Sequence, residues 1–247
     1  SEVEVVVTND GLLVGVSPDV SSSLVPVLDK FLVMEDAELS DVSAEYTWVD
    51  FHGLGAAALA DAAAKACGGT SASMNFTTQG GATLVLERDS LFELTRFIER
   101  TKALRLASDQ EWEAFRIAHA LGRFGVDFGD SDNPHEAALD RRAVSWSKGC
   151  YLGQEVVCMQ DMRGKLKRRL VALALDGVGT LPEVGSPVTT TDGAEAVGEL
   201  TSVARSPSTG RTLALARLKS PYFEGTAALG VAGVQAAFVQ QGSAEIG

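Results

Sequence analysis

Cysteine is scarce in this sequence, and long hydrophobic runs are missing. The 247 residues include only three cysteines, Cys67, Cys150 and Cys158, and no C-x-x-C pair. Such an odd, sparse set excludes a disulfide framework and a cysteine-based zinc site, and it indicates a reducing compartment. No apolar run approaches the roughly 20 residues that span a bilayer, and no basic start precedes an apolar core as in a signal peptide. We therefore expect a cytoplasmic protein that binds no membrane.

Positive charge is also in short supply. The chain has 21 Lys and Arg against 33 Asp and Glu, a net charge of −12. Because phosphate contacts dominate nucleic-acid affinity, this balance disfavours nucleic acid as a partner, and it disfavours an anionic membrane surface for the same reason. The three histidines, His52, His119 and His135, lack the spacing of metal ligands, so we predict no metal site.

The hydrophobic content of 45% is that of a globular protein, and its periodicity predicts an α+β first domain. A D-G turn between residues 3–8 and 12–16 predicts a hairpin. Helices and strands then alternate, as in a ferredoxin-like unit with helices on one face of a small sheet. The expected strands are 45–51, 73–78 and 82–87, and the expected helices are one capped by Ser21–Ser23, one at 54–67 and one opened by Asp89–Ser90. We assign this domain to residues 1–105.

The sequence pattern changes twice in the rest of the chain. A helix is predicted at 109–121, and an irregular, glycine-rich stretch follows it to residue 165; long irregular segments of this kind are more often functional than idle. From Leu166, short strand-like runs separated by turn residues predict a C-terminal antiparallel β-barrel. These runs are 166–175, 187–191, 196–204, 211–218 and 233–239. We assign a central segment to 106–165 and the barrel to 166–247.

The octapeptide K-G-C-Y-L-G-Q-E, residues 148–155, carries the most chemistry. Cys150 is a candidate nucleophile if a nearby cation such as Lys148 favours its thiolate. Gln154 and Glu155 end in hydrogen-bonding groups, and the two glycines permit backbone conformations that a Cβ would block. The alternative is a buried cysteine in a turn between domains. If Cys150 acts chemically, it should be more exposed than Cys67 and Cys158.

This octapeptide resembles the signature of the YgfZ branch of the glycine-cleavage T-protein superfamily, the folate-binding YgfZ/GcvT-like family. The similarity continues in an R-I…G-V-D stretch, a P-x-E segment, an R-G-K…R-R-L run and a V-G-x-x-T-S turn. These motifs are Arg116–Ile117 with Gly125–Asp127, Pro134–Glu136, Arg163–Leu170 and Val197–Ser202. Met159 and Ala118 stand where family members commonly have an arginine and a glutamate. The G-Y-x-G-E-x-G motif of the T-protein branch is absent, and so is the family's usual N-terminal stretch before the first strand.

The resemblance implies a T-protein-like fold with folate in a cleft where domains meet. It implies a tetrahydrofolate-binding accessory protein for iron–sulfur cluster assembly or repair, with iron–sulfur client proteins as partners and a polyglutamylated folate as one form of the ligand. Within the octapeptide it implies cofactor binding by Lys148, Tyr151, Gln154 and Glu155, and chemistry at Cys150. Two alternatives stay open: a folate-dependent aminomethyl or methyl transferase of the T-protein type, and a folate-independent interaction scaffold. Without the N-terminal stretch, we also expect an exposed apolar surface of more than a few hundred Å², or its coverage by another chain.

Arg116 and Glu136 are further candidates for the pterin cleft. The Glu136 carboxylate would match the adjacent N–H donors of an aminopyrimidine, but it is equally typical of a surface turn. Arg116 would position groups in the same cleft, or else form an ion pair with Glu113 or Asp127.

Five cations crowd into Arg163–Arg169, within a stretch, residues 140–170, that holds eight Lys and Arg against three Asp and Glu. They form either a footprint for an anionic ligand or a solvated strand face. Strand alternation places Lys165, Lys167 and Arg169 on the solvent or ligand side, opposite Leu166 and Leu170. Arg168 falls on the leucine side, so we expect it at the strand entrance or paired with a carboxylate such as Asp127 or Glu155.

Overall fold

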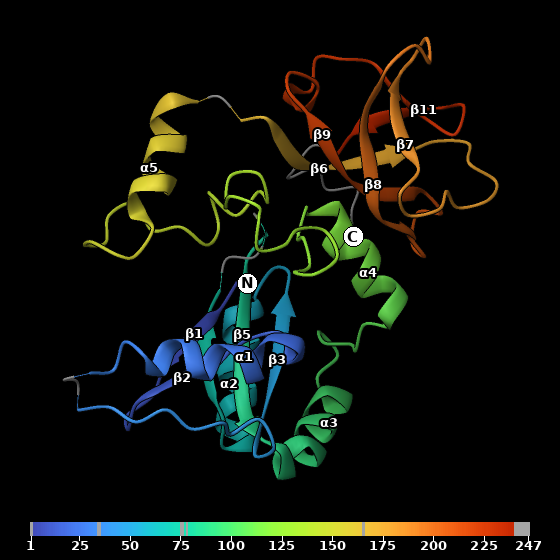
Figure 1. The fold of residues 1–247 in the computed structure, drawn as a ribbon. Helices are drawn as coiled ribbons and strands as arrows, with labels where there is room; N and C mark the ends of the chain where they lie inside the picture. The colour runs from blue at the N-terminus through green and yellow to red at the C-terminus, as the bar shows by residue number, and fades with distance from the viewer. Residues whose placement is uncertain (1, 34–35, 75–76, 78, 165, 240–247) are drawn as a thin grey trace. The chain divides into compact units, whose positions relative to one another are not determined.

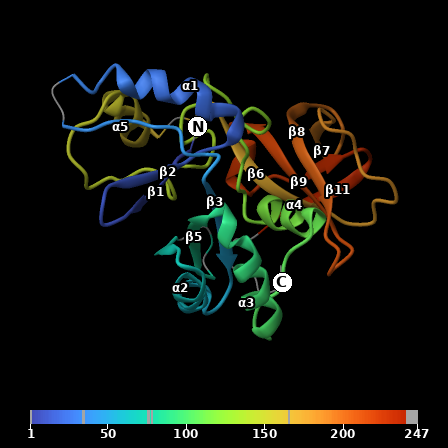
Figure 2. The ribbon, with the colours of Figure 1, turned by 90° about the horizontal axis from the view of Figure 1, so that it is seen from below.

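The chain folds into two compact units. The computed structural model describes residues 2–33, 36–74, 77, 79–164 and 166–239. The first unit is Ser1–Leu106 and the second is Ala107–Gly247; Figures 1 and 2 show the elements of each. The first mixes helices with small sheets, and the second holds a closed antiparallel barrel, which confirms the expected fold class. None of the described helices has the length and apolar character needed to cross a membrane.

The first unit opens with a two-stranded hairpin and a helix. Strands β1 (Glu4–Val7) and β2 (Leu12–Gly15) pair antiparallel, with Val5 opposite Val14 and Val7 opposite Leu12. This confirms the hairpin around the D-G turn. Helix α1 (Pro18–Asp29) begins earlier than the expected cap at Ser21–Ser23, because proline fits the first turn of a helix, where its missing N–H costs nothing.

A three-stranded sheet forms the body of the first unit. Its elements follow the order β3 (Tyr46–His52), α2 (Ala56–Cys67), β4 (Thr70–Ser73), β5 (Gly81–Glu87), η1 (Arg88–Ser90) and α3 (Leu91–Arg100). Strand β5 lies between β3 and β4 and pairs antiparallel with both. The sequence β-α-β-β-α gives the first five elements of a ferredoxin-like unit. The strand expected at 73–78 overlaps β4 only at Ser73, and residues 75, 76 and 78 lie outside what the structure describes.

The two faces of this sheet have different neighbours. Phe51, Leu84 and Leu86 face α2, whose buried alanines allow helix and sheet to approach closely. Because side chains alternate along a strand, Trp48 points to the opposite face. There its ring lies against the hairpin at Gly15, where an added Cβ would come within 2.8 Å of the indole. The hairpin therefore covers part of the face that the helices leave open.

The second unit is built on a closed barrel. Its strands are β6 (Arg168–Leu175), β7 (Pro187–Thr190), β8 (Ala196–Arg205), β9 (Thr212–Lys219), β10 (Leu229–Val231) and β11 (Val234–Phe238), closed in the order β10-β11-β6-β9-β8-β7, with the short 3-10 helix η2 (Tyr222–Glu224) after β9. Closure leaves no strand edge unpaired. The barrel interior is filled by aliphatic side chains such as Leu173, Leu200 and Leu218. The V-G-x-x-T-S segment lies inside β8, which is irregular between Leu200 and Ser202, and is not a turn.

Two helices precede the barrel. Helix α4 (Asp109–Ala118) starts with a capping box, in which Ser108 Oγ accepts the N–H of Glu111 and the Glu111 carboxylate accepts the N–H of Ser108. Its residues Ala114 and Ile117 pack outside the barrel against the outward-facing side chains of β6 and β9. Helix α5 (Gln154–Arg163) lies in the stretch that the sequence marks as irregular.

Gly198 gives a direct test of barrel packing. A Cβ at this position in β8 would lie 2.3 Å from the Arg217 carbonyl oxygen and 2.7 Å from the Leu218 side chain. We expect Gly198→Ala to lower the free energy of unfolding by about 2 kcal/mol or more in urea denaturation. The matched control is Gly179→Ala, since nothing lies within 4 Å of a Cβ there. Equal stability of the two variants would contradict this packing.

Candidate functional site

The octapeptide forms the turn that leads into α5. Gly153 immediately precedes the helix with φ +80°, a conformation that glycine adopts without strain. The N–H of Gln154, the first helical residue, donates to the Tyr151 carbonyl at 3.2 Å. The second glycine of the signature is thus explained by the geometry of the helix start. Gln154 and Glu155 occupy the first turn, where a carboxylate is favoured by the helix dipole.

Lys148 and Tyr151 lie together in this turn. The Lys148 ammonium is 4.5 Å from the centroid of the Tyr151 ring, a cation–π contact. Cys150, between them in sequence, is exposed, and Glu155 is exposed as well. The structure therefore presents a cation, an aromatic ring, a thiol and a carboxylate on one short surface segment.

His135 links the signature helix to the preceding segment. Its ring is buried, and Nε2 lies 3.4 Å from Oδ1 of Asp161 on α5. Nδ1 lies 3.0 Å from the Asn133 side-chain oxygen, and the ring centroid is 5.7 Å from that of Trp146. The sequence analysis assigns His135 no role, because the three histidines lack the spacing of metal ligands. Its position between Pro134 and the candidate residue Glu136 is the sequence signal that could have identified it.

Glu136 and Arg168 belong to one cluster of ion pairs. Arg168, the first residue of β6, contacts Asp132 at 2.8 Å and Glu136 at 3.4 Å. The expectation that Arg168 lies at the strand entrance is confirmed, but the expected partners Asp127 and Glu155 are wrong. Asp132, which sequence reasoning missed, also contacts Arg217 at 3.4 Å. The Glu136 carboxylate thus already forms an ion pair with an arginine of the barrel.

Arg169, which strand alternation predicts on the solvent or ligand side, is largely covered. It contacts Asp140 at 2.8 Å and donates to the His135 carbonyl at 2.9 Å, with 22% of its side chain exposed. The reason is that the segment before the signature folds back over the start of β6. Lys167 is exposed. Lys165 and the side chain of Arg163 lie outside what the structure describes, so the predicted footprint is seen only in part.

Arg116 is the centre of a buried ion pair. Its side chain is 3% exposed, and Nη1 donates to Asp127 Oδ2 at 2.9 Å and to the Leu121 carbonyl at 3.3 Å. The guanidinium also contacts the Glu113 carboxylate and donates to Ser202 Oγ at 2.7 Å. Both ion-pair partners that the sequence left open, Glu113 and Asp127, are therefore present.

Asp127 is fully buried and accepts four hydrogen bonds. Oδ2 accepts from Arg116 and from the N–H of Arg123 at 2.8 Å. Oδ1 accepts from the hydroxyls of Thr201 at 2.6 Å and Ser202 at 2.7 Å. These four donors satisfy both oxygens of the buried carboxylate. The G-V-D and T-S motifs, far apart in sequence, thus meet at one carboxylate.

The three cysteines differ in accessibility. Cys67 is buried at the end of α2, and burial raises the pKa of its thiol, to which Glu93 adds. Cys158, on α5, is half-buried, whereas Cys150 is exposed. Among the described residues, no group of three His, Cys, Asp or Glu side chains could hold a metal ion.

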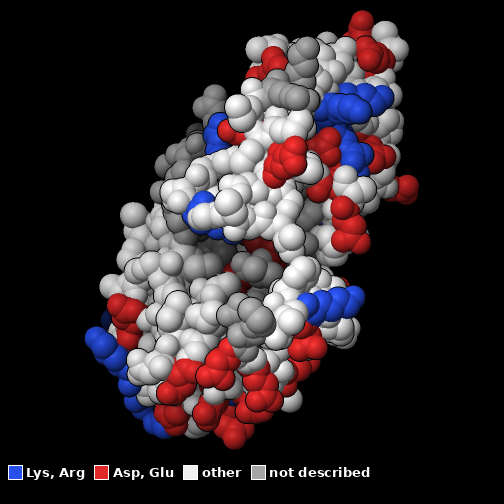
Figure 3. Space-filling model, turned by 60° about the vertical axis from the view of Figure 1, so that its left-hand side comes forward, with Lys and Arg blue, Asp and Glu red and all other residues white. Residues whose placement is uncertain are grey.

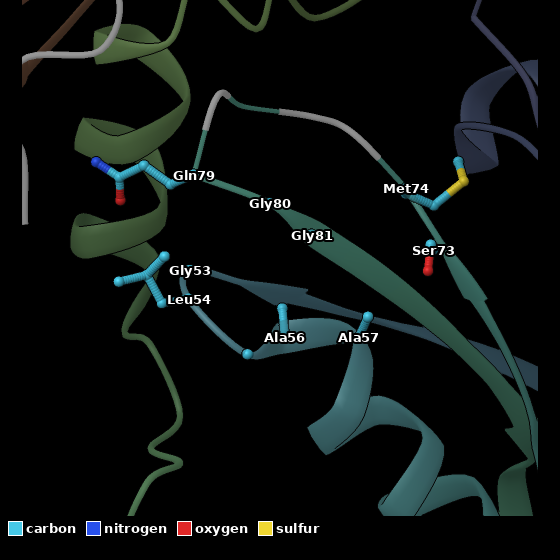
Figure 4. A pocket seen from close by; sticks show the side chains of 10 residues that line it. Gly53, Leu54, Ala56, Ala57, Ser73, Met74, Gln79, Gly80 and Gly81 are labelled. Atoms are coloured by element: carbon cyan, nitrogen blue, oxygen red, sulfur yellow. The ribbon is translucent and has the colours of Figure 1, made fainter.

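A pocket in the first unit lies apart in sequence from these residues. Its volume is about 360 Å³, and Figure 4 shows it between the start of α2, the end of β4 and the start of β5. It is lined by Gly53, Leu54, Gly55, Ala56, Ala57, Ser73, Met74, Gln79, Gly80 and Gly81. Among the described residues, the lining has no charged side chain and none of the candidate site residues.

The C-terminal barrel is similar to a domain of the glycine cleavage T-protein. Residues 168–242 match the glycine cleavage T-protein C-terminal barrel domain. The crystal structure of glycine cleavage system aminomethyltransferase T from Bartonella henselae matches 96% of this chain and 70% of its own, with a TM-score of 0.75. The sequence identity is 14%, so this likeness is one of fold.

Proteins with similar sequences include aminomethyltransferases. An aminomethyltransferase from Thermosynechococcus vestitus is 35% identical over 103 residues, which is 42% of this chain and 27% of that protein. Aminomethyltransferases from Staphylococcus saprophyticus and Staphylococcus haemolyticus are 31% and 32% identical over 112 residues, 45% of this chain and 30% of theirs. The similar stretch thus spans less than a third of these relatives. Together the barrel and these relatives support a relationship with the GcvT-like superfamily.

We expect native-state thiol labelling to follow exposure. A maleimide reagent in excess should modify Cys150 first, Cys158 more slowly and Cys67 last, because access decreases in that order and burial also raises the pKa of the Cys67 thiol. Peptide mass spectrometry over time identifies the order. Modification of Cys67 or Cys158 before Cys150 would remove Cys150 from the candidate site.

We expect the buried ion pair to dominate the stability of the second unit. Asp127→Ala removes the fully buried carboxylate that pairs with Arg116 and should cost about 3–5 kcal/mol of unfolding free energy in urea denaturation. The control is Asp176→Ala, whose partner Arg211 is 3.3 Å away on the surface, and which should cost less than about 1 kcal/mol. Comparable losses in the two variants would contradict this account.

Proposed function

We propose that this chain binds tetrahydrofolate and takes part in aminomethyl transfer. The observation that carries the proposal is the T-protein barrel domain at residues 168–242, joined by relatives that are named aminomethyltransferases. Tetrahydrofolate is the one-carbon acceptor that the T-protein resemblance implies. The short surface segment at residues 148–155 is the part of the second unit whose side chains suit such a ligand.

Each side chain of that segment has a definite chemical use toward a folate. The Lys148 ammonium attracts carboxylates as a point charge, and the Tyr151 ring beneath it offers an aromatic face. The Gln154 amide both donates and accepts hydrogen bonds. The carboxylates of Glu155 and Glu136 match paired N–H donors such as those of a pterin. We assign cofactor binding to these five residues.

Arg116 has a different role in this proposal. Its donors are directed to Asp127, Glu113, Ser202 and the Leu121 carbonyl, so it holds the segment after α4 in place. We therefore regard it as a positioning residue for the segment that carries Glu136, and not as a group that touches folate.

A second candidate function is favoured by Cys150. An exposed thiol, two residues after Lys148 in the sequence, suits the role of an accessory protein in iron–sulfur cluster assembly or repair, as the YgfZ-like signature implies. In that role the partners would be iron–sulfur client proteins, and the folate would be mono- or polyglutamylated.

Calorimetric titration with tetrahydrofolate tests ligand binding. We expect saturable binding that Lys148→Ala weakens about tenfold, the loss of one charge-assisted contact. Lys102→Ala, an exposed lysine of the first unit, is the matched control and should leave the affinity unchanged. No heat of binding at about 1 mM ligand, a limit of about −4 kcal/mol, would overturn the proposal and favour the scaffold alternative.

Turnover separates the two activities. Transfer of an aminomethyl group to bound tetrahydrofolate, retained in Cys150→Ser, supports the transferase. Folate binding without any transfer, together with cluster recovery in a client protein that is lost in Cys150→Ser, overturns the transferase in favour of the accessory role.

A further inference from the structure

The outer face of the β1-β2 hairpin is aliphatic and exposed. Val5, Val7, Leu12 and Val14 are 47%, 73%, 63% and 42% exposed. The register places Val5 opposite Val14 and Val7 opposite Leu12, so all four share one face. Val3, just before β1, is 45% exposed and extends the row by alternation. These fractions hold with α1 in place, and we call these five residues the hairpin face.

Packing on the inner side of β1 and β2 keeps the side chains of the hairpin face exposed. Val6 alternates with Val5 and Val7 and is 1% exposed. Gly15 lies against the Trp48 ring, where no side chain would fit. A one-residue slip would move Val6 out of the core and press the neighbouring side chains against Trp48. The exposure of the hairpin face is therefore built into the pairing of β1 and β2.

The dimensions of the hairpin face suit one helix. Two strands about 4.8 Å apart present a strip about as wide as a helix, which is about 10 Å across with its side chains. Four residues of strand extend about 13 Å, which is two to three turns of a helix. A sheet with an apolar face is stable when another element covers it. Scattered single aliphatics need no such partner, but five on one face form a patch.

Charge decides what kind of partner fits. Residues 1–29 contain the five carboxylates of Glu2, Glu4, Asp10, Asp19 and Asp29 and no Lys or Arg. The first unit as a whole has 16 Asp and Glu against seven Lys and Arg, a net charge of −9. In Figure 3, acidic side chains predominate over this unit, in the lower part of the view. A second copy would bring two such units together, whereas a basic partner gains from the same field.

We propose that the hairpin face binds an amphipathic helix of a partner protein, with an aliphatic stripe flanked by Lys and Arg. The stripe covers Val5, Val7, Leu12 and Val14, and the flanking cations are attracted by the net negative charge of the first unit. This interaction is independent of folate binding and of the residues assigned to it.

A synthetic helix tests this surface on the full chain. The probe is a dye-labelled, alanine-based peptide of about 14 residues, with Leu at every third or fourth position and Lys or Arg beside the stripe. We expect saturable binding by fluorescence anisotropy, weakened about tenfold by Val7→Thr and weakened further by added salt. The matched control is Val184→Thr, an equally conservative change at a 65% exposed valine of the second unit, which should leave binding unchanged.

Three results would overturn the proposal. The first is equal binding to wild type and Val7→Thr. The second is equal binding of a peptide with Glu in place of Lys and Arg. The third is a dimer in sedimentation that Val7→Thr dissociates, because the occupant would then be a second copy of the chain. Val7 is 73% exposed and threonine keeps the shape and strand preference of valine, so an unchanged melting temperature separates lost binding from lost folding.

Discussion

A buried guanidinium–carboxylate pair, Arg116 with Asp127, joins three separate parts of the second unit. Arg116 comes from α4, Asp127 from the segment after it, and Thr201 and Ser202 from the barrel strand β8. Neither charge could be buried alone, since an unpaired ion in the interior costs several kcal/mol. The pair is therefore stable only when helix, segment and barrel are assembled. Apolar packing of α4 against the barrel would allow several arrangements, and this hydrogen-bond geometry selects one.

The position of the central segment determines which cations are already paired with carboxylates and which remain exposed to a ligand. Once Asp127 is anchored, the chain runs over the start of β6, and the Leu170 N–H donates to the Glu136 carbonyl at 2.7 Å. Asp132 then meets Arg168 and Arg217, and Asp140 meets Arg169. Two cations of the predicted basic footprint, Arg168 and Arg169, thus bind the acidic segment before it. Arg141, Lys148 and Lys167 are the exposed cations of this region among the described side chains.

Local patterns in the sequence predicted the helices and strands that their own residues define. They did not predict contacts between residues that are far apart in the sequence. The hairpin, the alanine-rich helix α2 and the barrel strands follow from turn residues and periodicity within each segment. Helix α5 was missed because its apolar residues, Val156–Met159, are consecutive and show no helical period. Strand β10 has three residues, too few for a pattern. The partners of Arg168 were mistaken because ion pairs between segments leave no local signal, while Glu113 is found three residues before Arg116 on the same helix face.

The uneven distribution of charge constrains how an anionic folate could be recognised. The first unit carries −9, and the second carries 14 Lys and Arg against 17 Asp and Glu, with several of its arginines bound to carboxylates. Such a field repels a dianion at long range and does not steer it toward the surface. Screening by salt would weaken that repulsion beyond roughly 8–10 Å while leaving direct contacts intact. On the proposed function, affinity would therefore depend on short-range contacts, and the exposed Lys148 ammonium, 4.5 Å from the centroid of the Tyr151 ring, is the proposed group for one of them. Each glutamate of a longer folate tail adds charge to the same repulsion, so a longer tail strengthens binding only where it reaches an exposed cation such as Lys167.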